Sequence, residues 1–224
     1  MISAFVLMNT LLFISVDPSL GKVDKRSFSQ QTRMELFING IRNKEGIPGY
    51  SDHPNDITQW PELSFYEDKL SIIRWEMCRL EGEIDVQWLP STTREILVYD
   101  NALEGSLDLT VLPDVLIRGN FSFNKFSGEI NLTCLPPGLQ ELSLAANTFC
   151  GTVGLTKLPE TLYHLHLFAN SINGVIDVEK LPDSLAVLDV SFTMFEGNLR
   201  LPRYGELDIR TQCSGITSIA FYDE

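Results

Sequence analysis

Basic residues are scarce in this 224-residue sequence, with 17 Lys and Arg against 30 Asp and Glu and a formal net charge of −13. Nucleic acids and anionic membrane surfaces attract proteins with clustered Lys and Arg. The composition therefore argues against both, and a basic partner or simple solubility fits better. With 44% apolar and 10% aromatic residues, the chain can bury a sizeable core as one large domain or two small ones.

Cysteine is also scarce, and the spacings of the four residues match no zinc-binding pattern: Cys78, Cys134, Cys150 and Cys213. An even number is compatible with two disulfides in an oxidising compartment, and buried free thiols are an equal alternative. The sequence has no GxGxxG, GxxxxGK[ST], HExxH or GxSxG motif. Ser, His and Asp occur without a nucleophile turn, so we expect neither a catalytic triad nor a cofactor.

Long apolar runs are limited to the segment from Met1 to Val16, which carries no charged side chain. The run is short for a membrane span and has the length of a signal-peptide core. We expect residues 1–21 to be a signal peptide, with a loose cleavage site at Ser19, Leu20 and Gly21. A membrane anchor or a buried strand is the alternative.

What the sequence does contain is a 23-residue repeat. LPPGLQELSLAANTFCGTVGLTK starts at Leu135, and LPETLYHLHLFANSINGVIDVEK follows at once from Leu158. Five such units begin with Leu-Pro, at positions 89, 112, 135, 158 and 181, after a fainter unit from Tyr66. We therefore expect a cap over 22–65, about six repeats over 66–203, and a shortened last repeat and C-terminal edge over 204–224.

Residue types recur at fixed positions within each unit. Positions 8 and 10 are apolar in nearly every unit, as expected for alternate strand residues that face a core. Position 17 is always glycine, which suits a positive φ or a close approach between coils. Position 13 is asparagine in four units, and an inward amide at a bend can satisfy backbone groups of two coils. These ladder residues are Asn101, Asn124, Asn147 and Asn170.

The pattern LxxLxLxxN at a fixed period resembles leucine-rich repeats, and the chain is similar to extracellular repeat proteins of the plant type and to protozoan surface repeat proteins. The resemblance covers about residues 66–209. It implies a right-handed, curved solenoid with a parallel sheet on its concave face, short extended or 3-10 segments on its convex face, and a helical cap. The chain departs from the plant pattern because it lacks Ile-Pro after the glycine and paired cap cysteines.

The segment before the repeats predicts an amphipathic helix. Ser27 and Gln30 match a capping box, and Gly46 lies just past the expected end. Apolar residues follow at i, i+3, i+4 and i+7 and predict one core-facing stripe: Met34, Phe37, Ile38 and Ile41.

Positions 7, 9 and 11 of each unit are predicted to face the concave surface, with Asp208 in the column of position 9. Aromatic and histidine side chains there suit a binding surface, although such residues also favour strands merely because they fit a pleated sheet. A partner at an edge or loop is the alternative. We expect Tyr163, Phe168 and Phe192 to gather beside the histidines. The candidate binding residues are Tyr99, Arg118, Tyr163, His164, His166, Phe168, Asp189 and Phe192.

Two further features bear on this surface. His164 and His166 on one strand, with Asp189 on the next, resemble the start of a two-His, one-carboxylate metal site, but an open face offers no enclosed pocket. N-glycosylation sequons begin at Asn120 and Asn131. A glycan on Asn120 would block the middle of the face and leave the later repeats as the working surface.

The sequence thus predicts a non-enzymatic recognition module, secreted or on the cell surface. Its concave sheet would bind a protein or a glycan, without nucleic acid or a small-molecule cofactor. One alternative is an intracellular or membrane-proximal signalling adaptor that keeps the segment from Met1 to Val16. A metal-binding enzyme that uses His164, His166 and Asp189 is the weaker alternative.

Overall fold

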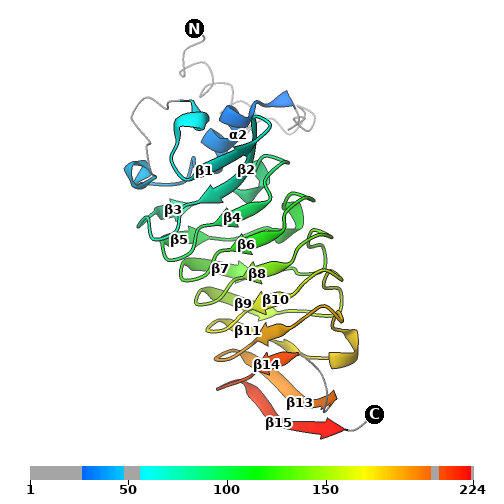
Figure 1. The fold of residues 1–224 in the computed structure, drawn as a ribbon. Coiled ribbons are helices and arrows are strands. Elements are labelled where there is room, and N and C mark those ends of the chain that lie inside the picture. Colours follow the sequence, from blue (N-terminus) through cyan, green and yellow to red (C-terminus); the bar gives the residue numbers. More distant parts are fainter. Residues whose placement is uncertain (1–26, 48–55, 203–206, 223–224) are drawn as a thin grey trace, which may run out of the picture.

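A computed structural model of the chain describes residues 27–47, 56–202 and 207–222. These residues form a parallel β-solenoid of about seven turns, in which successive coils are stacked along one axis (Figure 1). The predicted signal peptide, residues 1–21, lies outside the described residues. Within the described ranges, every helix is too short or too polar for a membrane span.

Short strands of successive coils form an eight-stranded sheet along one side of the stack. Its strands are β1 (Leu63–Tyr66), β2 (Lys69–Arg74), β4 (Glu95–Leu97), β6 (Arg118–Asn120), β8 (Glu141–Ser143), β10 (His164–His166), β12 (Val187–Asp189) and β14 (Asp208–Arg210). β1 and β2 form an antiparallel hairpin, and all later pairs are parallel. From β2 to β12 each residue pairs with the one 23 positions later, which is the period of the sequence.

The last coil is shorter than the others. Val187 pairs with Asp208, and Asp189 pairs with Arg210, so the register advances by two fewer positions at this step than at the steps before it. The prediction that Asp208 belongs to the column of position 9 is therefore wrong, because Arg210 occupies that place.

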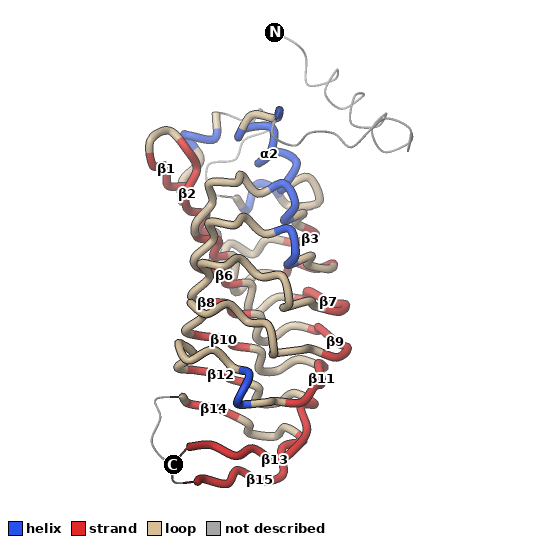
Figure 2. The backbone as a smooth tube through the Cα atoms, turned by 90° about the vertical axis from the view of Figure 1, so that its right-hand side faces the viewer, coloured by secondary structure: helices blue, strands red, loops and turns tan. Residues whose placement is uncertain are grey.

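A seven-stranded parallel sheet runs along the other side of the stack (Figure 2). It contains β3 (Glu81–Glu83), β5 (Ala102–Gly105), β7 (Lys125–Glu129), β9 (Thr148–Thr152), β11 (Ser171–Val175), β13 (Met194–Pro202) and β15 (Gly215–Tyr222). Short 3-10 helices follow some of these strands: η4 (Val86–Trp88), η5 (Leu109–Val111) and η6 (Val178–Lys180). Two more, η2 (Lys44–Gly46) and η3 (Ile57–Gln59), precede the first strand.

The bend between the two sheets is held by the asparagines of position 13. The Asn147 Oδ1 accepts a hydrogen bond from the Phe126 amide of the preceding coil. Its Nδ2 donates to the Phe121 carbonyl of that coil and to the Leu144 and Ala145 carbonyls of its own. Asn101, Asn124 and Asn170 make the same four bonds one coil apart. The ladder expected from the spacing therefore links successive coils through their backbones.

Helix α2 (Gln30–Phe37) lies at the N-terminal end of the stack (Figure 1). The predicted capping box at Ser27 is wrong, because the Ser29 Oγ accepts the bond from the Thr32 amide and caps the helix. Gln30 instead holds the first hairpin through Leu70 and Asp68. The helix ends well before Gly46, which belongs to η2. The four apolar stripe residues, Met34, Phe37, Ile38 and Ile41, are all buried, but only Met34 and Phe37 belong to the helix.

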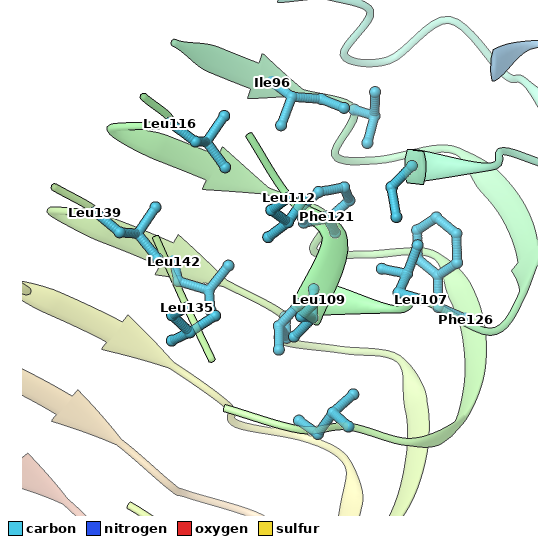
Figure 3. Close-up of a cluster of buried hydrophobic side chains, with 14 of the residues drawn as sticks. Ile96, Leu107, Leu109, Leu112, Leu116, Phe121, Phe126, Leu135, Leu139 and Leu142 are labelled. Carbon is cyan, nitrogen blue, oxygen red and sulfur yellow. The ribbon is translucent and has the colours of Figure 1, made fainter. Parts of the chain in front are cut away.

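One continuous apolar core fills the space between the sheets (Figure 3). Ile96, Leu142 and the other residues at position 8 point inward, and the Phe126 and Phe149 rings of neighbouring coils stack at 6.3 Å. Gly119 replaces the leucine of its coil. The Phe121 ring fills the gap, since a Cβ on Gly119 would lie 3.1 Å from Phe121 Cε2.

Candidate recognition surface

The outward residues of β4, β6, β8, β10 and β12, at positions 7 and 9, form what we call the strand face. Residues between them at position 8 are buried, as predicted. Position 11 differs from the expectation because Ser122, Ala145 and Ser191 are buried. Only the larger residues of that column, such as Tyr99 and Phe168, are partly exposed.

Position 7 of the strand face carries a row of alternating charges. The Arg118 Nη2 donates to Glu141 Oε1 at 3.1 Å, and its Nε lies 2.7 Å from Glu141 Oε2. The Glu95 carboxylate is 3.9 Å from Arg118 and 3.8 Å from Arg74. His164 Nδ1 lies 4.0 Å from Glu141. Arg118, a predicted binding residue, is therefore already engaged by two carboxylates of neighbouring strands.

Three phenylalanines follow the ends of these strands and form what we call the aromatic run: Phe123, Phe168 and Phe192. The Phe123 and Phe168 rings meet edge to face at 6.0 Å although their coils are not adjacent. Ala145 and Ala146 lie on the coil between them, hydrogen-bonded to the backbones of Phe123 and Phe168. Because both alanines are small, the two rings can meet over that coil.

The residues at position 12 all have left-handed backbones. Their φ values are 56° for Asp100, 53° for Phe123, 51° for Ala146, 54° for Ala169 and 53° for Phe192. Such a conformation is strained for a bulky side chain. Phe123 and Phe192 are nevertheless 52% and 51% exposed, so about half of each residue makes no packing contact that could offset the strain.

A hollow of about 360 Å³ lies beside Phe168 and Phe192 at the C-terminal end of the strand face. Asp189 lines it and is only 8% exposed, with its Oδ1 accepting a bond from the Ser191 amide at 3.0 Å. Arg210 and Gln212 line it from the last coil. The Arg210 Nε donates to Asp208 Oδ2 at 2.8 Å.

The histidines lie next to this hollow without lining it. The His164 and His166 ring centroids are 5.9 Å apart, and Tyr163 lies 4.5 Å from His164. Tyr163 precedes β10 and Phe168 follows it, so the expected gathering of Tyr163 with Phe168 and Phe192 does not form. Burial lowers the pKa of His166 below its usual value, His164 and Arg210 lower it further, and Asp189 and Glu141 partly oppose them.

The other sequence candidates are dispersed. Tyr99 and Arg118 belong to earlier coils than the hollow. Among the described residues, no three His, Cys, Asp or Glu side chains come close enough together to hold a metal ion. His164, His166 and Asp189 therefore do not form the metal site that the sequence suggested. The four cysteines form no disulfide with one another, and three of them are exposed. Neither the predicted disulfides nor the alternative of buried thiols is therefore found. Burial, with Glu76 and Glu62 nearby, raises the pKa of the remaining one, Cys78.

The two sequons adopt the same local turn. Asn120 Oδ1 accepts from the Ser122 amide at 3.1 Å and from its hydroxyl at 2.6 Å. Asn131 Oδ1 does the same with Thr133, at 2.9 and 2.7 Å. Asn120 is half-buried on the strand face, whereas Asn131 is exposed.

Sequence reasoning missed Phe123, Arg210 and Gln212. Phe123 stands at position 12 like Phe192, so the repeat alignment held the signal that the two are equivalent. Arg210 and Gln212 could not be aligned because the last coil is shorter.

No protein-family model and no curated protein matches the sequence. Solved structures with a similar fold include a plant ice-binding protein, with 16% identity and a TM-score of 0.66 over 86% of this chain and 77% of that chain. Pollen receptor kinase 3 has 23% identity and a TM-score of 0.57, over 72% of this chain and 81% of that chain. The BIR3–SERK2 complex from Arabidopsis thaliana has 20% identity and a TM-score of 0.56, over 81% and 97%.

At these identities the likeness concerns the fold alone. It agrees with the 23-residue register of the strands and with the asparagine ladder. The chain is therefore a parallel β-solenoid whose fold is similar to that of these solved structures.

Proposed function

We propose that this chain is a non-enzymatic recognition module that binds a protein partner through the aromatic run and the adjacent hollow. The observation that carries the proposal is the exposure of Phe123 and Phe192 at left-handed positions. Each combines a left-handed backbone with an apolar ring that is half exposed, and Ala146 and Ala169 hold the same position in other coils, so the fold itself does not require a phenylalanine there. Exposed aromatic side chains beside a depression are typical anchors of protein–protein interfaces.

The geometry favours the aromatic run over the row of charges at position 7 of the strand face. There, Arg118 and Glu95 are engaged with their neighbours, and exposed ion pairs of this kind contribute little binding energy. The aromatic run instead offers apolar surface over four coils. Parallel strands lie about 4.8 Å apart, so three steps from Phe123 to Phe192 extend roughly 14 Å, which suits a short segment of a partner.

One similar solved structure is a complex of two proteins, BIR3 and SERK2. Solenoids of stacked repeats expose extended surfaces that they use for binding. Because fold alone does not specify function, the proposal of a protein partner rests on the exposed phenylalanines of the aromatic run.

The proposal can be tested with a photo-crosslinking phenylalanine analogue at position 192. In an extract of the cells that produce the protein, we expect a discrete cross-linked protein. The same analogue in place of Val175, which is 70% exposed on the other sheet, should give none. With the captured protein, Phe168→Ala or Phe192→Ala should weaken binding roughly 30-fold, the effect of losing an interface anchor.

Two results would contradict this assignment. Equal cross-linking from positions 192 and 175 would mean that the aromatic run is not the contact surface. A cross-linked mass removed by glycosidases would identify a glycan as the ligand.

We also propose that the module is secreted or displayed on the cell surface. The apolar, uncharged segment from Met1 to Val16 supports removal of residues 1–21 as a signal peptide. Asn131 is the better glycan acceptor because it is exposed, whereas Asn120 is half-buried. The intact mass of protein recovered from culture medium tests both points: it should correspond to a chain that starts after Gly21 and carries one N-glycan.

A further inference from the structure

The geometry points to the hollow beside Phe168 and Phe192 as a site for a cationic side chain, lysine or arginine, of the protein partner. This inference rests on the proposed function and specifies the chemistry of one contact in it. It commits to a basic residue inserted between the aromatic run and the last coil. Three properties of the hollow carry it: its charge, its walls and its size.

Asp189 supplies the charge. It is only 8% exposed, and its hydrogen bond from the Ser191 amide engages a single carboxylate oxygen, Oδ1. A nearly buried carboxylate is costly unless a positive partner approaches it. Arg210 lies on the neighbouring strand, opposite Asp189, but its Nε is directed to the exposed Asp208.

The balance of charge around the hollow leaves room for one more cation. The charged residues that line the hollow are Asp189 and Arg210. Arg210 is hydrogen-bonded to Asp208, which lies outside the lining, and it also interacts electrostatically with Asp189. His166 adds little positive charge near neutral pH, because burial lowers its pKa. Arg210 is thus shared between two carboxylates, and the three groups together carry one net negative charge, which agrees in sign with the net charge of −13 of the whole chain.

The walls and the size fit the same ligand. Phe168 and Phe192 both line the hollow, and aromatic faces attract ammonium and guanidinium groups while they pack against an aliphatic stem. Gln212 lines it as well and has an amide oxygen that can accept hydrogen bonds. A volume of about 360 Å³ is at the lower end for small-ligand pockets, about 300–1,000 Å³, and suits a single long side chain.

A phage-displayed library of random heptapeptides, selected on the wild-type protein, provides the probe. Peptides enriched on the wild type are synthesised with each basic residue retained or replaced by norleucine, which keeps the stem and removes the charge. We expect one basic residue whose replacement weakens binding tenfold or more. This difference should shrink below twofold on Asp189→Asn, which keeps the oxygen that accepts from Ser191.

Asp183→Asn is the matched control, because it removes the same charge from an exposed residue of the same coil. It should leave the lysine–norleucine difference intact. Higher ionic strength should reduce that difference on the wild type.

The outcomes separate the inference from the proposed function. Enriched peptides that bind equally well with norleucine, yet lose binding on Phe192→Ala, would overturn the cationic site and leave the aromatic run as the contact surface. An equal lysine–norleucine difference on wild type and Asp189→Asn would also overturn the cationic site. Binding that is unchanged by Phe168→Ala and Phe192→Ala, or a library with no enriched peptide, would count against both.

Discussion

Single residues decide how one coil is fastened to the next. Asn147 satisfies one amide and three carbonyls with one side chain, and the same arrangement recurs at Asn101, Asn124 and Asn170. The bonds of Asn147 lie at a buried bend, so its amide has no substitute there. Thr193 takes this position in the following coil and makes only a bond to Val190 and a long one from Phe195.

Replacing Asn147 by leucine should therefore lower the free energy of unfolding by about 2–4 kcal/mol, because the buried Phe126 amide and its partner carbonyls would lose their bonds. Urea denaturation followed by circular dichroism measures the change. Asn131→Leu is the control, since this exposed side chain bonds only within its own turn, and it should cost less than about 1 kcal/mol. Equal losses in the two variants would contradict the coil-linking role.

The residues that could be predicted from the sequence are those that the period itself fixes. The apolar residues of position 8 and the asparagines of position 13 face the core because every coil needs them there. The left-handed backbone of position 12 left no such signal, since its residues include Phe123, Ala146 and Phe192 and no glycine. Nor did the spacing indicate that Ala145 and Ala146 would let Phe123 meet Phe168.

At the scale of elements, the N-terminal end of the stack is closed by both backbone and side chains. Ile41 bridges to Gly82 of β3, with bonds from the Arg42 amide to Glu81 and from the Glu83 amide to Gly40. The Phe37 and Trp60 rings lie 6.0 and 6.2 Å from Trp75. The segment around Ile41 thus extends the seven-stranded sheet and covers its first edge strand.

Gly82 allows this close approach. It has a φ of 100°, and a Cβ there would lie 2.3 Å from the Gly40 carbonyl oxygen. Gly82→Ala should destabilise the protein by roughly 2–4 kcal/mol, because it adds backbone strain and separates the N-terminal segment from β3. Gly154→Ala, where a Cβ would meet nothing within 4 Å, should change stability by less than about 1 kcal/mol. Thermal denaturation measures the midpoints of the two variants. Equal midpoints would rule out a close approach between Gly82 and the Gly40 carbonyl.

The boundaries of elements were predicted less well than their existence. The apolar period predicted a helix at α2, but the predicted stripe runs past its end, because Ile38 is the C-cap residue and Ile41 pairs with Gly82. The sequence also offers two serines, Ser27 and Ser29, as caps. Only the bond from Thr32 identifies Ser29. Similarly, a shortened last repeat was expected, but the sequence did not show by how many residues. Because the step is two residues shorter, Arg210 and not Asp208 lies beside Asp189.

At the scale of the whole molecule, one repeating register organises the fold, and departures from that register form the candidate site. Each coil pairs only with its two neighbours, so the stability of such an array is approximately a sum over coils and their interfaces. The repeat therefore predicted the solenoid. The candidate site depends instead on residues that break the repeat, such as Phe123, Phe192 and the short last coil, and so it could not be derived from the consensus.

Removing one complete coil tests this organisation. Deletion of residues 135–157 joins Cys134 to Leu158, and every strand of the next coil can then occupy the register of the one removed. Asn170 would replace Asn147 beside Phe126, since the two asparagines make equivalent bonds. We expect a folded protein with a cooperative thermal transition and a midpoint lower by several degrees, because one interface is lost.

The same deletion should also abolish binding at the candidate site. Phe123 and Phe168 would come to lie on adjacent coils, and the spacing of the aromatic run would shorten by about 4.8 Å. Deletion of residues 135–145 is the control: it removes half a coil, breaks the register, and should leave no cooperative transition. If the variant that lacks residues 135–145 still folded, the core of each coil would not depend on its contact with the next coil, contrary to this interpretation. A full-coil deletion that still binds would show that the spacing of Phe123, Phe168 and Phe192 does not determine recognition.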